Sequence, residues 1–147
     1  MHKLLVAFSL AALALFAAAC GSDPGGSSSE GGVPTGKVIK SAPVGNNLTV
    51  ELANEEGALK HGEEEFYFTF KDAAGKPVDV GAVALNFHMP AMGPMAVMND
   101  PVTFTTTGTP GVYRGKANIE VAGEWQAQIT YEGPAGKGKT SFPVNAR

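Results

Sequence analysis

Four methionines recur at every third residue within one short segment of the chain. They are Met89, Met92, Met95 and Met98, and His88 directly precedes the first of them. The chain has five methionines in all, and the remaining one is the initiator. Thioether sulfur is a soft ligand that suits Cu(I), and imidazole is a borderline ligand that also suits copper. Two or three thioethers with one imidazole bind Cu(I) without the deprotonation that a thiolate needs. The segment therefore predicts a copper(I) site.

The backbone of this segment is interrupted by two prolines, Pro90 and Pro94, which exclude a helix. A polyproline-like or turning path is expected, and a polyproline path would place all four methionines on one side. The preceding alternation puts His88 at the end of a strand, pointing away from the core, and leaves Met89 in the core-facing register. Met92 and His88 are therefore the strongest ligand candidates, and Met89 is the weakest.

Two other interpretations of the methionines stay open at this point. Methionine fills gaps in cores, so Met92, Met95 and Met98 could pack as a lid over the open end of a domain. An exposed methionine patch could equally bind a protein partner, which would make the chain an adaptor or interaction module of the cell envelope. Replacement of the methionines by leucine separates these roles, because packing tolerates that change better than metal ligation does.

The elements that must position these residues are strands. Apolar and polar residues alternate with the period of half-buried strands, and turns rich in Gly and Pro separate the runs. The alternating runs cover residues 48–52, 66–70, 83–88, 102–104, 113–121, 125–131 and 142–144. No segment after the N-terminal apolar run has a helical period. The pattern predicts an all-β domain over residues 37–147, an Ig-like β-sandwich of about seven strands.

Three further features are interpreted as architecture. The glutamate-rich stretch 54–65 is expected to be a solvated connection, and its His61 has no second histidine one helical turn away to form a zincin motif. Trp125 is predicted to lie in the core, the alternative being a cation–π cap over bound Cu(I). Tyr113 is predicted to pack at the start of a strand.

The N-terminus has the features of a secretory signal. Lys3 precedes an apolar run that ends in small residues, and Cys20 follows it. The position of Cys20 resembles the lipobox of bacterial lipoproteins, although Ala17 stands where that motif usually has leucine. We expect a signal peptide at 1–19, lipid attachment at Cys20 through acyl chains such as palmitate, and a flexible lipid-anchored linker at 20–36. The domain would then be extracytoplasmic, in the periplasm or on the cell surface, and anchored to the membrane.

The composition argues against several classes of function. The net charge is −3 and there is no basic patch, which argues against a nucleic-acid partner. Cys20 is the only cysteine, so the domain has no disulfide of its own. After removal of the signal, His61 and His88 are the only histidines, and no nucleophile–base pattern or phosphate-binding loop is visible. We therefore expect no enzymatic activity.

Four stretches together resemble one known family. Residues 87–95 (Phe-His-Met-Pro-Ala-Met-Gly-Pro-Met) resemble the Met-Pro-x-Met-Gly-Met signature of the YtkA-like domain. Residues 72–78, 111–115 and 122–125 resemble its Asp-x-x-Gly-x-Pro-Val turn, its Gly-x-Tyr-x-Gly strand start and its Gly-x-Trp strand. The stretches follow the order of the family, and the resemblance covers residues 48–144.

The resemblance implies an extracytoplasmic Ig-like sandwich, often found on lipoproteins or fused to metal-efflux adaptors. It also implies copper handling, with a copper oxidase assembly factor or an efflux component as partner. The chain departs from the signature at Pro94, which is inserted into the Met-Gly-Met run. The insertion moves Met95 one residue later and leaves its role as a ligand open.

Overall fold

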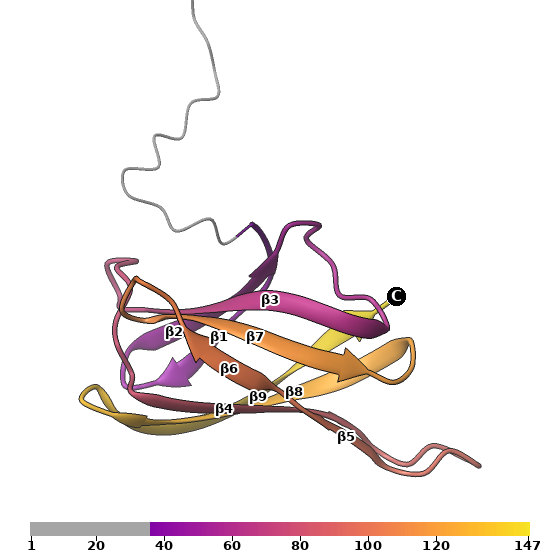
Figure 1. The fold of residues 1–147 in the computed structure, drawn as a ribbon. Coiled ribbons are helices and arrows are strands. Elements are labelled where there is room, and N and C mark those ends of the chain that lie inside the picture. The colour runs from indigo at the N-terminus through magenta and orange to yellow at the C-terminus, as the bar shows by residue number, and fades with distance from the viewer. Residues whose placement is uncertain (1–35) are drawn as a thin grey trace, which may run out of the picture. The chain divides into compact units, whose positions relative to one another are not determined.

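The computed structural model describes residues 36–147, which form two antiparallel sheets packed as a sandwich (Figure 1). The first sheet has the order β1-β2-β3-β7-β6, and the second has the order β5-β4-β8-β9. The strands are β1 (Lys37–Gly45), β2 (Leu48–Asn54), β3 (Gly62–Lys71), β4 (Ala82–Met89), β5 (Met98–Pro101), β6 (Thr103–Thr106), β7 (Val112–Ile119), β8 (Gly123–Gly133) and β9 (Gly136–Ala146). The predicted signal peptide, Cys20 and the linker up to residue 35 lie outside the described residues.

The core lies between the two sheets and is built by the alternation seen in the sequence. Phe66, Phe68 and Phe70 of β3 are all fully buried on the inner face of the first sheet. Phe66 meets Phe87 of the second sheet edge to face, with ring centroids 5.7 Å apart, and Phe70 meets Tyr131 in the same way at 5.6 Å. The prediction of an all-β sandwich is confirmed.

Two of the strands were not among the predicted runs. The edge strand β1 contains a register shift between Val38 and Lys40, which breaks the alternation, and it carries Pro43, which an edge strand tolerates. The short strand β5 has the sequence Met-Asn-Asp-Pro, which has no apolar alternation because its inward-facing residue is the buried Asp100. Both strands are defined by their pairing with a neighbour and not by their own sequence pattern.

The expectation of a solvated connection over 54–65 is wrong for its last four residues, which belong to a strand. Strand β3 begins at Gly62, so the three consecutive glutamates that follow belong to a strand paired with β7. The remaining connection is also not fully solvated, because Leu59 is completely buried and forms a parallel bridge with Ala146 of β9. The glutamates led to a prediction of solvent exposure, and the single leucine among them was not recognised as a buried residue.

The chain passes from one sheet to the other at Val102. Strand β5 pairs with β4 in the second sheet, and β6 pairs with β7 in the first, with only Val102 between them. The Val102 amide donates to the Leu85 carbonyl of β4 at 3.0 Å, which fixes this crossing.

The β4–β5 hairpin extends beyond the sheets (Figure 1, lower right). Its base lies beside the start of β8, where Gly123 pairs with Ala146 near the end of β9. Strand β1 starts in the first sheet, where Lys37 pairs with Asn54. No helix long and apolar enough to cross a membrane occurs in residues 36–147.

Candidate metal centre

The methionine segment forms the tip of a long hairpin between β4 and β5, which we call the methionine hairpin (residues 88–99). At its base, His88 pairs with Asn99, and Met89 pairs with Met98. At its tip, Met92 and Met95 form an isolated antiparallel bridge, in which each amide donates to the other residue's carbonyl, at 3.1 and 3.0 Å. The four methionines therefore form two cross-strand pairs and do not lie along one side of a polyproline path.

A two-residue turn closes the hairpin tip. Gly93 occupies the first central position with φ of +56°, and Pro94 follows with its φ fixed at a negative value by its ring. This sign pattern is that of a type II′ turn, which favours glycine at the first position and matches the twist of the flanking strands. Pro94 thus takes the second turn position, and Met95 lies directly opposite Met92.

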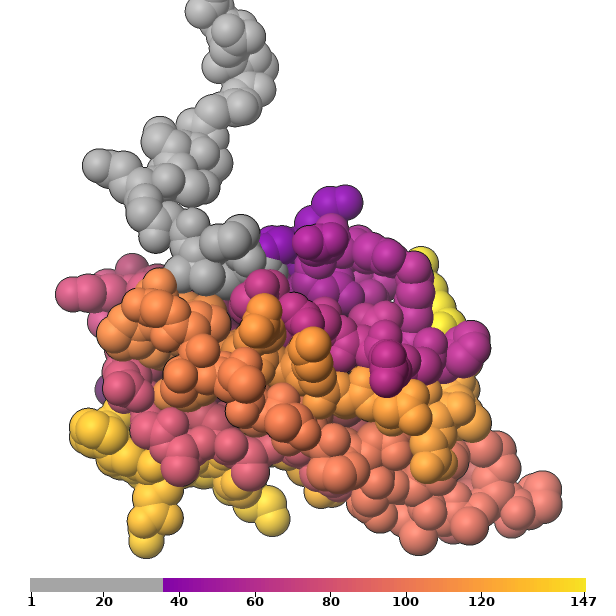
Figure 2. All heavy atoms as spheres, in the orientation of Figure 1, coloured from indigo at the N-terminus to yellow at the C-terminus, as the bar shows by residue number. Residues whose placement is uncertain are grey.

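Met92 and Met95 are exposed, at 52% and 41%. Residues exchanging both backbone hydrogen bonds across an antiparallel pair project their side chains on the same face, with Cβ atoms about 5 Å apart. Two flexible thioethers at this separation can direct their sulfur atoms at one ion. The hairpin residues protrude from the body of the domain, so this pair is open to other molecules (Figure 2, salmon).

Met89 lies in the core, with 2% of its surface exposed. Its terminal methyl group lies 3.2 Å from the place that a Cβ atom on Gly123 would occupy. Gly123, at φ of +145°, therefore makes room for Met89 at the β7–β8 turn. Its cross-strand partner Met98 is partly buried and packs against the same core. The prediction that Met89 faces the core is confirmed.

His88 lies on the outer face of the second sheet, as its register predicted, and is held there by Asn99, which Asn86 contacts in turn. Its Nδ1 lies 2.9 Å from Asn99 Oδ1, and the Asn86 side-chain amide donates to the same oxygen at 3.0 Å. Because a carbonyl oxygen accepts, this contact favours the tautomer with the hydrogen on Nδ1 and the lone pair on Nε2. Such a hydrogen bond to the other ring nitrogen is how metal-binding histidines are usually oriented.

His88 and the methionine pair at the tip are separated along the hairpin. His88 precedes Met92 by four residues, and four residues of extended strand span about 13 Å. The register therefore brings Met92 and Met95 together but places the imidazole at the hairpin base. Within residues 36–147, no group of three or more His, Cys, Asp or Glu side chains is arranged to hold a metal ion.

Asn99 and Asp100 are site residues that the sequence analysis missed. Asn99 orients His88, and the buried Asp100 accepts the Glu120 backbone amide through Oδ2 at 3.0 Å. This bond ties β5, the second leg of the methionine hairpin, to the β7–β8 turn. The sequence around Asn99 and Asp100 does not indicate these roles. The hairpin itself has a sequence signal, because the Gly93-Pro94 pair between two methionines is compatible with a two-residue loop.

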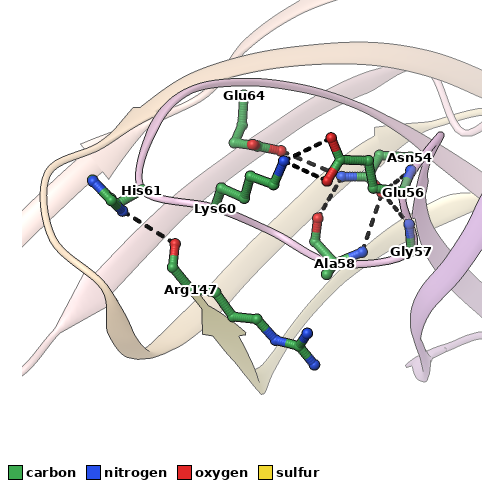
Figure 3. A network of polar contacts seen from close by, with 8 residues as sticks. All are labelled: Asn54, Glu56, Gly57, Ala58, Lys60, His61, Glu64 and Arg147. Carbon is green, nitrogen blue, oxygen red and sulfur yellow. Dashed lines mark hydrogen bonds and ion pairs between the residues drawn. The ribbon is translucent and has the colours of Figure 1, made fainter.

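The second histidine belongs to a polar network around the connection between β2 and β3 (Figure 3). His61 donates its backbone amide to the Arg147 carbonyl at 2.9 Å, and its Nδ1 lies 3.1 Å from the same oxygen. Asn54 organises the connection that leads to it, since its Oδ1 accepts the backbone amides of Glu56, Gly57 and Ala58.

Charges in this network follow from local contacts. Burial raises the pKa of the Glu64 carboxyl above its ordinary value, and a hydrogen bond from Asn54 opposes that rise. The hydrogen bond and charge of Glu56 raise the pKa of Lys60. The polar side chains of the connection therefore bond mainly to one another. This arrangement is expected of a structural network.

The remaining family positions serve the core. Trp125 is fully buried, as predicted, and its Nε1 donates to the Val121 carbonyl at 3.0 Å. Tyr113 packs at the start of β7, and its hydroxyl lies 3.3 Å from the Val80 amide and 3.1 Å from both Asp79 Oδ1 and the Gly81 carbonyl.

A family model described as YtkA-like matches residues 44–130. The chain belongs to the YtkA-like family. The matched range contains the whole methionine hairpin and runs from the end of β1 into β8. No curated protein and no solved structure matches this YtkA-like chain.

Proposed function

We propose that this YtkA-like protein binds copper(I) outside the cytoplasm as a chaperone or buffer and is anchored to a membrane by lipid on Cys20. The observation that carries the proposal is the exposed cross-strand pair of Met92 and Met95 at the hairpin tip. A neutral, soft and solvent-accessible donor pair fits Cu(I) better than it fits hard cations or Zn²⁺. Copper is here a cargo, and no catalytic step is proposed.

The residues proposed to hold the ion follow from their positions. Met92 and Met95 would supply the two principal thioethers. His88, with its Nε2 lone pair, and the partly buried Met98 are the secondary candidates at the hairpin base. Met89 is left out of the set because its side chain is packed in the core.

The exposed position of the pair supports transfer of the ion. A site with few donors on a protruding hairpin leaves coordination positions that ligands of another protein can occupy (Figure 2). Exchange of Cu(I) between soft ligands avoids release of the free ion. We propose a copper oxidase assembly factor or an efflux component as the partner, located at the membrane that carries the lipid.

Titration of Cu(I) against a chromophoric chelator tests this function in a fragment of residues 37–147, which retains all nine strands. We expect binding tighter than micromolar, and a loss of affinity in Met92→Leu, Met95→Leu and the double variant. Met89→Leu is the matched control, because leucine fits a core position of similar volume and this side chain is not a proposed ligand.

The register makes a further distinction among the ligands. Since His88 lies four residues from the tip pair, His88→Gln should reduce Cu(I) affinity less than Met95→Leu does. The proposal is wrong if the unmodified fragment does not bind Cu(I) more tightly than micromolar. It is also wrong if the double leucine variant binds Cu(I) as tightly as the unmodified fragment.

The alternative function is a protein-interaction module of the cell envelope. It is favoured by a third exposed apolar side chain on the hairpin, Val97, which is 53% exposed and lies beside the two exposed methionines in the sequence. Pull-down from a membrane extract with and without copper distinguishes the two. Capture that is independent of copper and unchanged by the leucine substitutions would favour the adaptor.

A further inference from the structure

We infer that Met92 and Met95 form a reversible oxidation site, in which peroxide converts the thioethers to sulfoxides and a methionine sulfoxide reductase restores them. The inference rests on the different environments of the four methionines. Met92 and Met95 are 52% and 41% exposed, Met98 is partly buried, and Met89 is 2% exposed. Oxidation of methionine by small oxidants depends on access to the sulfur atom.

The chemistry is a two-electron oxygen transfer. A sulfur lone pair of the thioether attacks hydrogen peroxide, the O–O bond breaks, one oxygen atom forms an S–O bond, and the other leaves as water. The reverse step uses a reductase with two thiols, which become a disulfide while the sulfoxide oxygen leaves as water. Peroxide is the oxidant, and the dithiol enzyme is the reductant.

The fold confines this reaction to the hairpin tip. Met89 is covered by the core and by the β7–β8 turn at Gly123, so its sulfur is protected while the sandwich stays folded. The bridge between Met92 and Met95 uses only backbone atoms, at 3.1 and 3.0 Å. Oxidation of the side chains therefore leaves the hydrogen bonds of the tip in place, and the modification does not require unfolding.

The consequence for the metal rests on the copper function proposed above. A sulfoxide presents a polar oxygen in place of a soft sulfur, and hard donors bind Cu(I) poorly. Oxidation of the pair would remove both principal ligands at once. The hairpin tip would then hold copper while Met92 and Met95 are thioethers. It would release the ion after peroxide converts them to sulfoxides.

The first experiment maps the modification without copper. The full chain is treated with dilute hydrogen peroxide in the presence of a copper chelator, and the sulfoxides are located by peptide mass spectrometry over time. We expect Met92 and Met95 to be oxidised first, Met98 later and Met89 last. In denaturant, all four should react at similar rates, which is the control showing that the fold sets the order. The inference is overturned if Met89 in the folded protein is oxidised as fast as Met92.

The second experiment measures reversal and effect. Treatment of the oxidised protein with methionine sulfoxide reductases of both stereospecificities should return Met92 and Met95 to thioethers, and failure to do so in the folded protein overturns reversibility. Cu(I) affinity should fall by at least about tenfold on oxidation, equivalent to about 1.4 kcal/mol, and recover after reduction. If the reduced protein does not bind Cu(I), the proposed function fails while the oxidation map still stands. If it binds equally well before and after oxidation, only the inferred link between oxidation and copper release fails.

Discussion

The terminal methyl group of Met89 occupies the space that a side chain on Gly123 would need, 3.2 Å from the position of its missing Cβ. This contact joins the base of the methionine hairpin to the start of β8, the neighbouring strand of the same sheet. It also explains why one methionine of four is structural. Met89 is the last residue of β4 and continues its core-facing register, whereas Met92 and Met95 lie beyond that strand.

Gly123→Ala should destabilise the domain. The residue has φ of +145°, a region that side chains rarely adopt, and its Cβ would press on Met89. We expect a loss of about 1–3 kcal/mol in the free energy of unfolding, measured by chemical denaturation. Cu(I) affinity measured on the folded variant should stay unchanged, because Met89 is not a proposed ligand. A large fall in affinity would return Met89 to the ligand set.

Asp100→Ala should destabilise the domain by removing the acceptor of the Glu120 backbone amide. A hydrogen bond to a charged group contributes about 1.5–3 kcal/mol, and we expect the free energy of unfolding to fall by that amount. Glu120→Ala is the matched control, since it keeps the backbone amide and removes only an exposed side chain. Equal losses in the two variants would mean that the bond from Asp100 is not the stabilising contact.

Gly93→Ala should weaken copper binding more than it weakens the fold. Its φ of +56° at the first position of the turn is costly for alanine, but the tip can open locally without disturbing the sandwich. We expect a lower Cu(I) affinity with a change of less than about 1 kcal/mol in the free energy of unfolding. Gly75→Ala is the control, because Gly75 also has positive φ in an open turn, distant in sequence from the methionine hairpin. It should leave copper affinity unchanged.

Tyr113→Phe should alter the dependence of stability on pH. Burial raises the pKa of the Tyr113 phenol above its ordinary value of 10.0. A group whose pKa is higher in the folded state stabilises fully below its unfolded pKa and loses that contribution as pH rises through the folded value. Stability of the natural protein should therefore decline above about pH 10. Phenylalanine should remove this part of the decline.

The same variant should also be less stable at neutral pH. It removes the hydroxyl oxygen that accepts from the buried Val80 amide, at 3.3 Å, and the proton shared between Asp79 and the Gly81 carbonyl. Leaving a buried amide without an acceptor costs about 1–3 kcal/mol. Thermal or chemical unfolding at several pH values measures both effects, and parallel pH curves for the two proteins would contradict the assigned role of the phenol.

The strands that face the core were predictable because burial on one face imposes alternation on the sequence. Phe66, Phe68 and Phe70 are a direct case, and His88 and Met89 were placed on the correct faces by the same rule. The edge strands β1 and β5 were not predictable in this way. Their residues are specified by hydrogen bonds to a neighbouring strand, which no local pattern records.

The methionine segment could be located from the sequence, but its geometry could not. A polyproline path would have placed all four methionines on one side, whereas the Gly93-Pro94 turn folds them into an exposed pair and a partly or fully buried pair. The sequence also gave no indication of Asn99, because orientation of His88 depends on the β4–β5 register. Cross-strand partners of this kind are fixed only when the hairpin closes.

The start of β1 is connected to the base of the methionine hairpin through a series of pairings. Lys37 pairs with Asn54, and the adjoining connection bridges through Leu59 to Ala146, whose partner Gly123 contacts Met89. Strands from both sheets thus support the hairpin base. A substitution that loosens the connection at Leu59 can therefore reach the methionine hairpin without touching any of its residues.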